Sequence, residues 1–468
     1  MERVSSTISR SFPSSQRRTS VKKVLIANRG EIAVRIIRTL KEMDLHSVAV
    51  YSTADRNSLH VALADESICI GPAKSSDSYL DFESIAAAIE VSGADAVHPG
   101  YGFLSESEAF ARRMEEIGVT FIGPTSDTIS RMGDKAMARQ TMKEAGVPVI
   151  PGSDGVIDSF EEVEKVAEDI GYPLVIKAVS GGGGKGMRFV HEPAQLEKQY
   201  KDAKKEAKNA FGDDRIYIEK FIERARHIEV QVVGDGQGNA IHLYERDCSI
   251  QRNNQKLIEE APAAILDDAS RKDITERTAE AVAKLGYRGA GTVEYLYVES
   301  EDAFYFIEMN TRIQVEHTIS EEITGVDIVR LQLEVAKEEV LTLTQDDIAI
   351  NGFAIECRIN AENPADNFMP APGPIDTLHF GMGQGVRIDS HVYPGYAVPP
   401  HYDSMIAKII VHAHSREAAI GKMMHVLDET VIGPVETNLD FQHYLMNHPN
   451  YQSNTVDIKF LLNNHIIE

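Results

Sequence analysis

The sequence predicts α/β structure at its N-terminal end followed by α+β structure, and three observations support this. From residue 24 onward, short apolar strands alternate with helices, which is the βαβ order of a parallel sheet. Residues 173–190 have the pattern of two strands joined by a glycine-rich loop. The C-terminal part mixes strands with helix. With 468 residues, the chain is long enough for roughly two to four domains.

The N-terminal elements follow one another in a regular order. Strands are expected at residues 24–27, 47–51, 67–70, 94–97 and 120–122, and the first helix at residues 31–44. Asn28-Arg29-Gly30-Glu31 lies at a strand-to-helix turn, where α/β sheets often bind ligands. His98-Pro99-Gly100-Tyr101-Gly102 is a rigid turn after another strand.

The remaining elements are expected in a less regular order. A helix opens at Gly133-Asp134-Lys135 and ends near Gly146. The segment 333–350 is expected to be helical and then looser. The other expected elements are strands at 173–179, 187–190, 215–219, 354–360 and 406–412, and helices at 268–285 and 416–430, the first of these helices followed by a hairpin.

Composition excludes several classes of protein. The chain carries 48 Lys and Arg against 72 Asp and Glu, a net charge of −24, which disfavours nonspecific nucleic-acid binding or attachment to an anionic membrane. No apolar run approaches the roughly 20 residues of a membrane span. The cysteines, Cys69, Cys248 and Cys357, are scattered, so we expect a reducing, cytoplasmic compartment and no zinc site.

Residues 1–23 differ from the rest of the chain. They are rich in serine and basic residues and lack an apolar core, so a secretory signal is not expected. A disordered tail, a translation start near Val21 and an organelle transit peptide are the alternatives, and the first two are favoured because Val21-Lys22-Lys23 leads directly into a strand.

One row of side chains carries the strongest functional signal. Glu308, Asn310, Arg312, Gln314 and Glu316 alternate with mostly apolar residues, so in an extended chain they would share one face. A solvated strand also alternates, but with interchangeable polar residues. The mixed chemistry of this row favours an active site.

The glycine run supplies a second signal. Gly181-x-Gly183-x-x-Gly186 matches a dinucleotide fingerprint, but a strand rather than a helix is expected to follow it. It is not a Walker A loop, because Gly186 stands where Ser or Thr should follow Lys185. A strand–glycine loop–strand hairpin with Lys177 and Lys185 suits a flap that closes over phosphates, since glycine amides can approach phosphate oxygens without a Cβ in the way. The alternative is a disordered surface hairpin.

The pairing of two strands predicts a metal site. If the turn after residue 298 centres on residue 301, Glu294 lies directly opposite Glu308, and their Cβ atoms are about 5 Å apart. Such carboxylates repel one another unless a hard cation lies between them, and Asn310 adds a neutral oxygen on the same face. This pattern favours Mg²⁺. The alternative is a pair relieved by a lysine or by a raised pKa.

Together these motifs resemble those of biotin carboxylase, an ATP-grasp enzyme of biotin-dependent carboxylases. The resemblance covers nearly everything after residue 22, and its motifs occur in order. They are residues 28–33, 98–106, the glycine run, residues 255–256, 259–262, 308–317, 356–362 and 402–405.

The resemblance implies a domain organisation. After a disordered extension at 1–22, a Rossmann-like N-terminal domain is expected at 23–133. An ATP-grasp domain is expected at 134–335, with a mobile lid at about 152–222, and a C-terminal α+β domain at 350–465. The family forms homodimers, and the same is expected here.

The resemblance also implies roles for individual residues. ATP would be held by Lys135, Lys177, the loop residues Gly182, Gly183, Gly184 and Lys185, and by Glu219, Lys220, Ile222, His227, Gln251 and Asn254. Glu294, Glu308 and Asn310 would bind Mg²⁺ or Mn²⁺. Bicarbonate would be held by Lys256, Arg312, Gln314, Val315 and Glu316, with Glu316 as the base. Arg358 would stabilise the oxyanion of the biotin ureido ring.

Two segments depart from the family pattern. The family commonly has a basic residue where Asn253 stands and often a histidine where Asn254 stands. After Glu316-His317 it usually has Pro-Val-Thr, whereas residues 318–320 here are Thr-Ile-Ser, so a less rigid loop is expected after the base. These departures suggest a divergent member of the family.

The implied activity is the ATP-dependent carboxylation of biotin through carboxyphosphate, the first half-reaction of an acetyl-CoA or other acyl-CoA carboxylase. The biotin carboxyl carrier protein and the carboxyltransferase subunits are expected on other chains. A biotin carboxylase subunit of a two-chain pyruvate carboxylase and an ATP-grasp carboxylate–amine ligase are the alternatives. A regulatory subunit without turnover is disfavoured, because every metal and base residue is retained.

Overall fold

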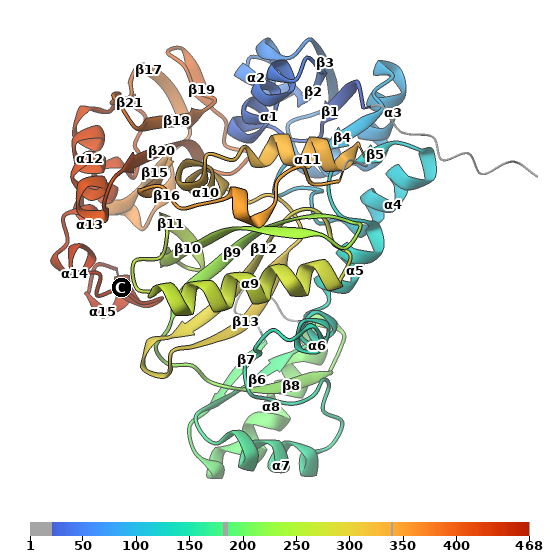
Figure 1. Ribbon diagram of the computed structural model, residues 1–468, viewed down its shortest axis with the longest axis vertical. Coiled ribbons are helices and arrows are strands. Elements are labelled where there is room, and N and C mark those ends of the chain that lie inside the picture. The colour runs from blue at the N-terminus through green and yellow to red at the C-terminus, as the bar shows by residue number, and fades with distance from the viewer. Residues whose placement is uncertain (1–20, 181–185, 338–339, 468) are drawn as a thin grey trace, which may run out of the picture.

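The computed structural model describes residues 21–180, 186–337 and 340–467. Figure 1 shows three lobes around a long sheet: the N-terminal elements at the upper right, a lid at the bottom and the C-terminal elements at the left. Over the described residues, no helix combines the length and the apolar character needed to cross a membrane.

The N-terminal lobe is built on a parallel sheet of strand order β3-β2-β1-β4-β5, and all five expected strands are confirmed. Because the order reverses beside β1, the turns after β1 and β4 lie together at the carboxyl edge of the sheet. The strands are β1 (Lys23–Ile26), β2 (His46–Ser52), β3 (Glu66–Gly71), β4 (Ala96–His98) and β5 (Thr120–Phe121). The helices are α1 (Gly30–Glu42), α2 (Leu59–Leu63), α3 (Phe82–Ser92), α4 (Glu108–Ile117) and α5 (Ser126–Gly133).

The turn at residues 28–31 joins lobes and does not line the large cavity described below. The Asn28 amide donates to the carbonyls of Pro99 and Tyr101, both at 2.7 Å, which locks the two strand-end turns together. Arg29 forms an ion pair with Asp55 at 2.6 Å and lies 4.2 Å from the ring centroid of Tyr402 in the C-terminal lobe. In this structure the turn therefore packs the N-terminal lobe against the C-terminal lobe.

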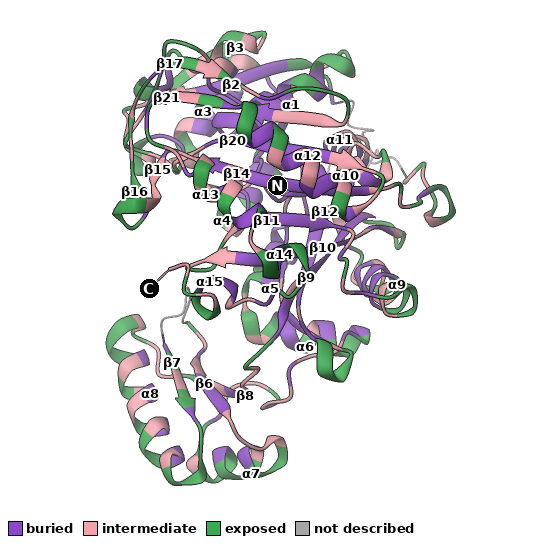
Figure 2. Ribbon diagram, turned by 90° about the vertical axis from the view of Figure 1, so that its left-hand side faces the viewer, coloured by how far each residue is buried: buried purple, intermediate pink, exposed green. Residues whose placement is uncertain are grey.

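The lid is a separate small α+β unit. Its antiparallel sheet has the order β7-β6-β8, and its apolar core includes Val163, Ile176 and Ile218. Figure 2 shows it as the lower lobe, with much exposed surface on its helices. The strand expected after Gly186 is confirmed, whereas residues 181–185 lie outside the described residues. Its elements, with the preceding helix, are α6 (Lys135–Ala145), α7 (Phe160–Ile170), β6 (Leu174–Ala178), β7 (Met187–Val190), α8 (Leu196–Phe211) and β8 (Ile216–Lys220).

One antiparallel sheet runs through the middle of the molecule and into the C-terminal lobe. Its order is β13-β12-β9-β10-β11-β14-β20-β18, so the pairing of β11 with β14 joins the two lobes by backbone hydrogen bonds. The strands are β9 (Arg226–Asp235), β10 (Ala240–Arg252), β11 (Gln255–Ala261), β12 (Arg288–Val298), β13 (Ala303–Asn310), β14 (Phe353–Asn360), β18 (Val386–Ser390) and β20 (Met405–Ala413). The helices beside it are α9 (Asp268–Lys284), α10 (His317–Thr324) and α11 (Ile328–Ala336).

The helix expected at the start of the segment 333–350 begins and ends earlier in the chain. The Asp327 carboxylate accepts the Arg330 N–H at 2.8 Å and caps α11, which therefore begins at Ile328 and ends at Ala336. Leu341 and Leu343 instead pack as non-helical chain against the core beneath the N-terminal sheet. The prediction missed the aspartate cap and so placed the helix too late, whereas the looser chain that it expected after the helix is present.

The C-terminal lobe adds short strands and helices around the end of the large sheet. The helix expected at residues 416–430 is confirmed as α12 (Arg416–Glu429). The other elements are β15 (Glu362–Asn363), β16 (Met369–Pro370), β17 (Gly373–His379), β19 (Tyr396–Val398), β21 (Val431–Pro434), α13 (Leu439–Met446), α14 (Pro449–Gln452) and α15 (Phe460–Asn463).

Candidate active site

A cavity of ≈ 1080 Å³ lies between the large sheet, the lid and α15. The sheet contributes charged and amide side chains, whereas the lid strand β7 contributes Met187 and Phe189. Predicted site residues that line it are Lys135, His227, Gln251, Asn254, Lys256, Glu294, Glu308, Asn310, Arg312, Gln314, Val315, Glu316 and Arg358. Residues from six strands, α6, the turn between β10 and β11 and the segment after β13 therefore meet at one site.

The hairpin β12–β13 places the two predicted metal carboxylates opposite each other. Glu294 is the direct partner of Glu308, as expected. The turn itself is centred half a residue earlier, because Tyr295 pairs with Phe306 and Val298 pairs with Ala303. A bulge at Ile307 supplies the extra residue and restores the predicted pairing.

The charges around this pair are unequal. Burial alone would raise the pKa of Glu294, but Lys256 and His227, each 3.0 Å from a Glu294 oxygen, hold that pKa well below its usual value. Burial, and then the charge of Glu294, raise the pKa of Glu308. The alternative explanation for this pair named a lysine or a raised pKa. Lys256 does contact Glu294, and the pKa of Glu308 is raised.

The donor set nevertheless fits a hard divalent cation. Two carboxylates face each other on adjacent strands, and the Asn310 amide lies beside them, donating to Glu294 Oε1 at 2.9 Å. Carboxylate and amide oxygens are the ligands that Mg²⁺ takes in sites it shares with phosphates. A cation here would also offset the repulsion that raises the pKa of Glu308.

The row of polar residues from Glu308 to Glu316 is extended only in its first part. The strand β13 ends at Asn310, and the chain continues as a loop to α10. All five predicted side chains still line the cavity. Arg312 is held by Glu106 at 2.9 Å and by the Asn310 oxygen at 2.8 Å, so hydrogen bonding rather than strand alternation sets its direction.

Lys256 is the electrostatic centre of the cavity floor. Its ammonium lies 2.5 Å from Glu229, 2.6 Å from Glu316 and 3.0 Å from Glu294. Burial alone would lower the pKa of Lys256, but these three carboxylates raise it well above its usual value. Lys256 therefore stays protonated and is available to an anionic ligand.

Glu316 lies between two cations. Burial alone would raise its pKa, but Lys256 and Arg358, the latter at 2.9 Å, hold the pKa of Glu316 well below its usual value. Arg358 also donates to Glu259 at 2.6 Å. Burial raises the pKa of Glu259 to about 8, against the opposing effect of Arg358.

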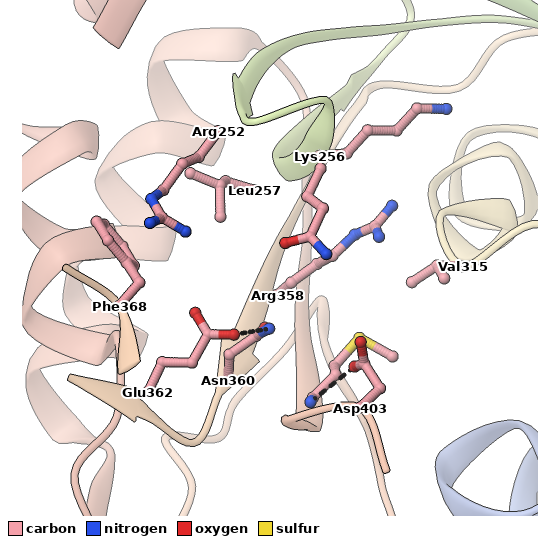
Figure 3. A pocket seen from close by; sticks show the side chains of 11 residues that line it. Arg252, Lys256, Leu257, Val315, Arg358, Asn360, Glu362, Phe368 and Asp403 are labelled. Carbon is pink, nitrogen blue, oxygen red and sulfur yellow. Dashed lines mark hydrogen bonds between the residues drawn. The ribbon is translucent and has the colours of Figure 1, made fainter. Parts of the chain in front are cut away.

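A second cavity of ≈ 130 Å³ shares Lys256, Val315 and Arg358 with the first (Figure 3). Its other walls come from β10 and β11, with Arg252 and Leu257, and from the C-terminal lobe, with Glu362, Phe368 and Asp403. The Arg358 side chain projects into this space in Figure 3. The candidate site therefore has two compartments that share Lys256 and Arg358, the two cations that pair with Glu316.

Several predicted nucleotide residues lie apart from the cavity. Within the described chain, Lys177, Glu219, Lys220 and Ile222 are in or beside the lid sheet and do not line it. Lys177 forms an ion pair with Glu219 at 2.5 Å. Gly182, Gly183, Gly184 and Lys185 lie outside the described residues.

The departure at Asn253-Asn254 has a backbone explanation. Arg252 pairs with Gln255, so these asparagines form a two-residue hairpin turn, and their φ angles are +50° and +62°. Positive φ at both positions is typical of a type I′ turn, where asparagine is favoured. The Gln251 amide beside the turn contacts the His227 ring at 2.8 Å.

The departure after Glu316 does not produce the looser loop that was expected. Residues 317–324 form the helix α10, in which Thr318 and Ser320 are buried. The Thr318 hydroxyl donates to Glu356, and the Ser320 hydroxyl accepts from Arg246 at 3.0 Å. These hydrogen bonds fix the segment that follows the predicted base.

Sequence reasoning missed two buried residues beneath the site. Glu229 accepts from Lys256 and from Arg246, and Arg246 donates to Gln314 at 2.8 Å. Both side chains are fully buried. The alternation of His227, Glu229 and Gln231 along one apolar strand was a signal that could have identified Glu229.

A small glycine-hairpin lid over a sheet that carries paired carboxylates is the architecture of the ATP-grasp enzymes. Three family models match in order: the biotin carboxylase N-terminal domain at residues 20–129, the ATP-binding domain of the carbamoyl-phosphate synthase L chain at 134–344, and the biotin carboxylase C-terminal domain at 356–463. The chain belongs to the biotin carboxylase family.

Individual relatives agree along nearly the whole chain. Biotin carboxylase 1 of Bacillus subtilis is 52% identical over 441 residues, which cover 94% of this chain and 98% of the relative. A biotin carboxylase complex from Campylobacter jejuni has a TM-score of 0.89 at 49% identity, covering 95% and 99%. The biotin carboxylase domain dimer of Hydrogenobacter thermophilus 2-oxoglutarate carboxylase, with MgADP, ADP and bicarbonate, has a TM-score of 0.87 at 45% identity, covering 95% and 98%.

Proposed function

We propose that the protein uses ATP and bicarbonate to carboxylate biotin on a separate carrier protein. The observation that supports this most directly is the position of Glu316 in the large cavity between Lys256 and Arg358, two cations that line both compartments. One compartment is large enough for a nucleotide, and the smaller one suits the ring of a second substrate. Lys256 and Arg358, which hold this carboxylate, line both.

The large cavity would hold Mg²⁺·ATP. Glu294, Glu308 and Asn310 would bind the cation, which when bound neutralises charge on the transferring phosphate. Lys135, His227, Gln251 and Asn254 line the same cavity, and Met187 and Phe189 of β7 offer it an apolar surface. Lys177, Lys185, Glu219, Lys220 and Ile222, with Gly182, Gly183 and Gly184, would join them when the lid closes.

Bicarbonate would bind at Lys256, Arg312, Gln314 and Val315. An anion beside Lys256 draws that ammonium's interaction away from Glu316, and this raises the pKa of Glu316 from its depressed value. Glu316 is then able to take the proton of bicarbonate. The bicarbonate oxygen attacks the γ-phosphorus, the bond from that phosphorus to the β-bridging oxygen breaks, and ADP leaves carboxyphosphate behind.

Biotin would enter the smaller compartment. Carboxyphosphate decomposes there to CO₂ and phosphate, the released phosphate accepts the proton of the ureido nitrogen, and that nitrogen then forms a bond to the carbon of CO₂. Arg358 projects into this space and is held cationic by Glu259 and Glu316, so it can stabilise the ureido oxyanion. Neither the departure at Asn253-Asn254 nor the one at residues 318–320 replaces Arg358, Glu259 or Glu316.

The biotin carboxyl carrier protein and the carboxyltransferase subunits are the proposed partners, and a homodimer is the proposed assembly. The related dimer of Hydrogenobacter thermophilus supports the last point. Acetyl-CoA or another acyl-CoA is the proposed final acceptor, with pyruvate as the alternative, and the cytoplasm is the proposed location.

ATP cleavage measured with and without bicarbonate and free biotin tests this function. Cleavage should require bicarbonate and increase with biotin. An ATP-grasp carboxylate–amine ligase would need neither, and activity that is indifferent to both compounds would refute the proposal.

A further inference from the structure

Lys408 is a sealed lysine that touches the active-site loop from behind. It lies on β20 of the C-terminal lobe, and its side chain has 0% exposure. Its ammonium donates to the main-chain carbonyl of Val315 at 2.6 Å. Burying a lysine ammonium away from water is energetically unfavourable, so its charge and its hydrogen bonds need partners inside the protein.

Three carboxylates from different segments surround this lysine. Glu31 of α1 lies 3.4 Å away, Glu356 of β14 3.9 Å and Asp389 of β18 4.0 Å. Burial alone would lower the pKa of Lys408, but these carboxylates raise it, so the ammonium stays charged. The lysine thus joins the N-terminal lobe to the C-terminal lobe at the back of the site.

The carbonyl that Lys408 binds is part of the peptide bond between Val315 and Glu316. Because a peptide unit is planar, fixing this carbonyl also fixes the N–H and the Cα of Glu316, the atom from which its side chain departs. Glu316 is followed at once by α10, so its position is constrained from both sides. On the other side, the Val315 carbonyl is held by Lys408, which lies 93 positions further along the chain.

We propose that Lys408 is a positioning residue for the 315–316 peptide, and that it places Glu316 and the Val315 wall of the bicarbonate site. The inference rests on the proposed function. It extends to Glu31, which pairs with Lys408 and also accepts a hydrogen bond from the Tyr101 hydroxyl. The turn after β4 and the base loop are thereby tied to one buried ammonium.

The variant Lys408→Met tests this inference, because it keeps an unbranched side chain while removing the donor and the charge. Lys422→Met is the matched control: Lys422 lies in the same lobe and also donates to main-chain carbonyls, those of His412 at 2.6 Å and Gln384 at 2.9 Å, away from the site. Both variants are purified full length. Their melting temperatures, kcat, and the KM values for bicarbonate and Mg²⁺·ATP are measured.

Lys408→Met should lower kcat/KM for bicarbonate by about 10²-fold, the order expected for a displacement near 1 Å, and should leave the KM for Mg²⁺·ATP unchanged. Lys422→Met should change neither constant. A lower melting temperature with an unchanged kcat/KM for bicarbonate would make Lys408 merely structural and overturn the inference. If the wild type itself shows no bicarbonate-dependent cleavage, the proposed function fails instead.

A second variant covers the case in which Lys408→Met does not fold. Glu31→Gln removes one of the three charges facing Lys408 and leaves the lysine in place. It should show a smaller loss in the same constant, kcat/KM for bicarbonate, again with the KM for Mg²⁺·ATP unchanged. Equal losses in kcat/KM for bicarbonate and for Mg²⁺·ATP, or no loss in either, would count against the positioning role.

Discussion

A lysine on the floor of the cavity and a lysine in the lid have different surroundings. On the floor, Lys256 is surrounded by three carboxylates and is 12% exposed. In the lid, Lys177 has Glu219 as its carboxylate neighbour and is 25% exposed. The floor lies on a sheet that continues through two lobes, whereas the lid has a three-stranded sheet and a core of its own.

This difference indicates a division of labour. Groups that must meet the reacting atoms at fixed distances are built on the large sheet, where preorganised charges act without rearranging. The lid residues that are predicted to hold the nucleotide lie on a small unit with a core of its own, the kind of unit that can move as a body without disturbing that sheet. Substitutions on the cavity floor should therefore alter the reaction rate. Substitutions at the cavity rim, where the Asn253-Asn254 turn lies, should alter nucleotide affinity.

The largest effect is expected for Glu316→Gln, which removes the proposed base. Biotin-independent ATP cleavage and biotin carboxylation should fall together, by about 10²–10⁴-fold, because both need activated bicarbonate. The two rates are measured in parallel under saturating ATP. Loss of carboxylation with full ATP cleavage would assign Glu316 to the biotin compartment alone.

Arg358→Ala should separate the two activities. Carboxylation of biotin should fall by about 10²–10³-fold, the usual cost of one oxyanion donor, while the slow biotin-independent cleavage should be largely retained. Because Arg358 also pairs with Glu259, the melting temperature should fall as well. The ratio of the two activities, rather than stability, is therefore the decisive reading, and a parallel loss of both would make Arg358 a structural bridge.

Glu308→Gln should weaken the use of Mg²⁺·ATP without harming the fold. The loss should be at least the roughly 10–100-fold that removal of a mere outer partner of a metal site costs. Without divalent cations the variant should be as stable as the wild type or more stable, because a carboxylate that repels Glu294 is gone. A large loss of metal-free stability would make Glu308 structural.

The pH dependence of that stability has a definite sign. The pKa of Glu308 is raised above 4.5 in the folded protein, so the folded state binds more protons than the unfolded state just above that pH. The free energy of unfolding of the wild type should therefore decrease as pH rises through this window. Denaturant titrations without metal should show the Glu308→Gln variant gaining on the wild type as pH rises, and the two should converge near the acidic end.

The smallest effect is expected at the rim, for Asn254→His. Restoring the histidine common in the family should improve nucleotide binding by about 1 kcal/mol, the net value of one hydrogen bond. Histidine also tolerates positive φ better than most residues, so the turn should survive. Calorimetric titration with an ATP analogue measures the change, and unchanged or weaker affinity would show that the turn has repacked around asparagine.

The sequence was most informative where a local pattern sets the geometry. Strand alternation and the length of one hairpin were enough to place Glu294 opposite Glu308, although the bulge at Ile307 that makes this register correct could not be foreseen. The strand after Gly186 was predicted for the same reason. The roles of the nucleotide and bicarbonate residues came from the family resemblance and remain predictions.

What the sequence did not reveal depends on contacts between distant segments. Arg29 contacts Tyr402, and Lys408 contacts Glu31 and Val315, across sequence separations that no local periodicity encodes. Glu229 and Arg246 are buried on interior strands, where a charged residue is identified as functional only once its partners are known.

The attack of bicarbonate on the γ-phosphate is the central claim, and oxygen transfer tests it directly. The enzyme is supplied with Mg²⁺·ATP and bicarbonate labelled with ¹⁸O in unlabelled water, and the phosphate released is analysed by mass. If carboxyphosphate forms, one bicarbonate oxygen stays on phosphorus, and the phosphate should carry one ¹⁸O atom. Phosphate whose new oxygen comes only from water would contradict the account, because the floor of the cavity would then activate water and not bicarbonate.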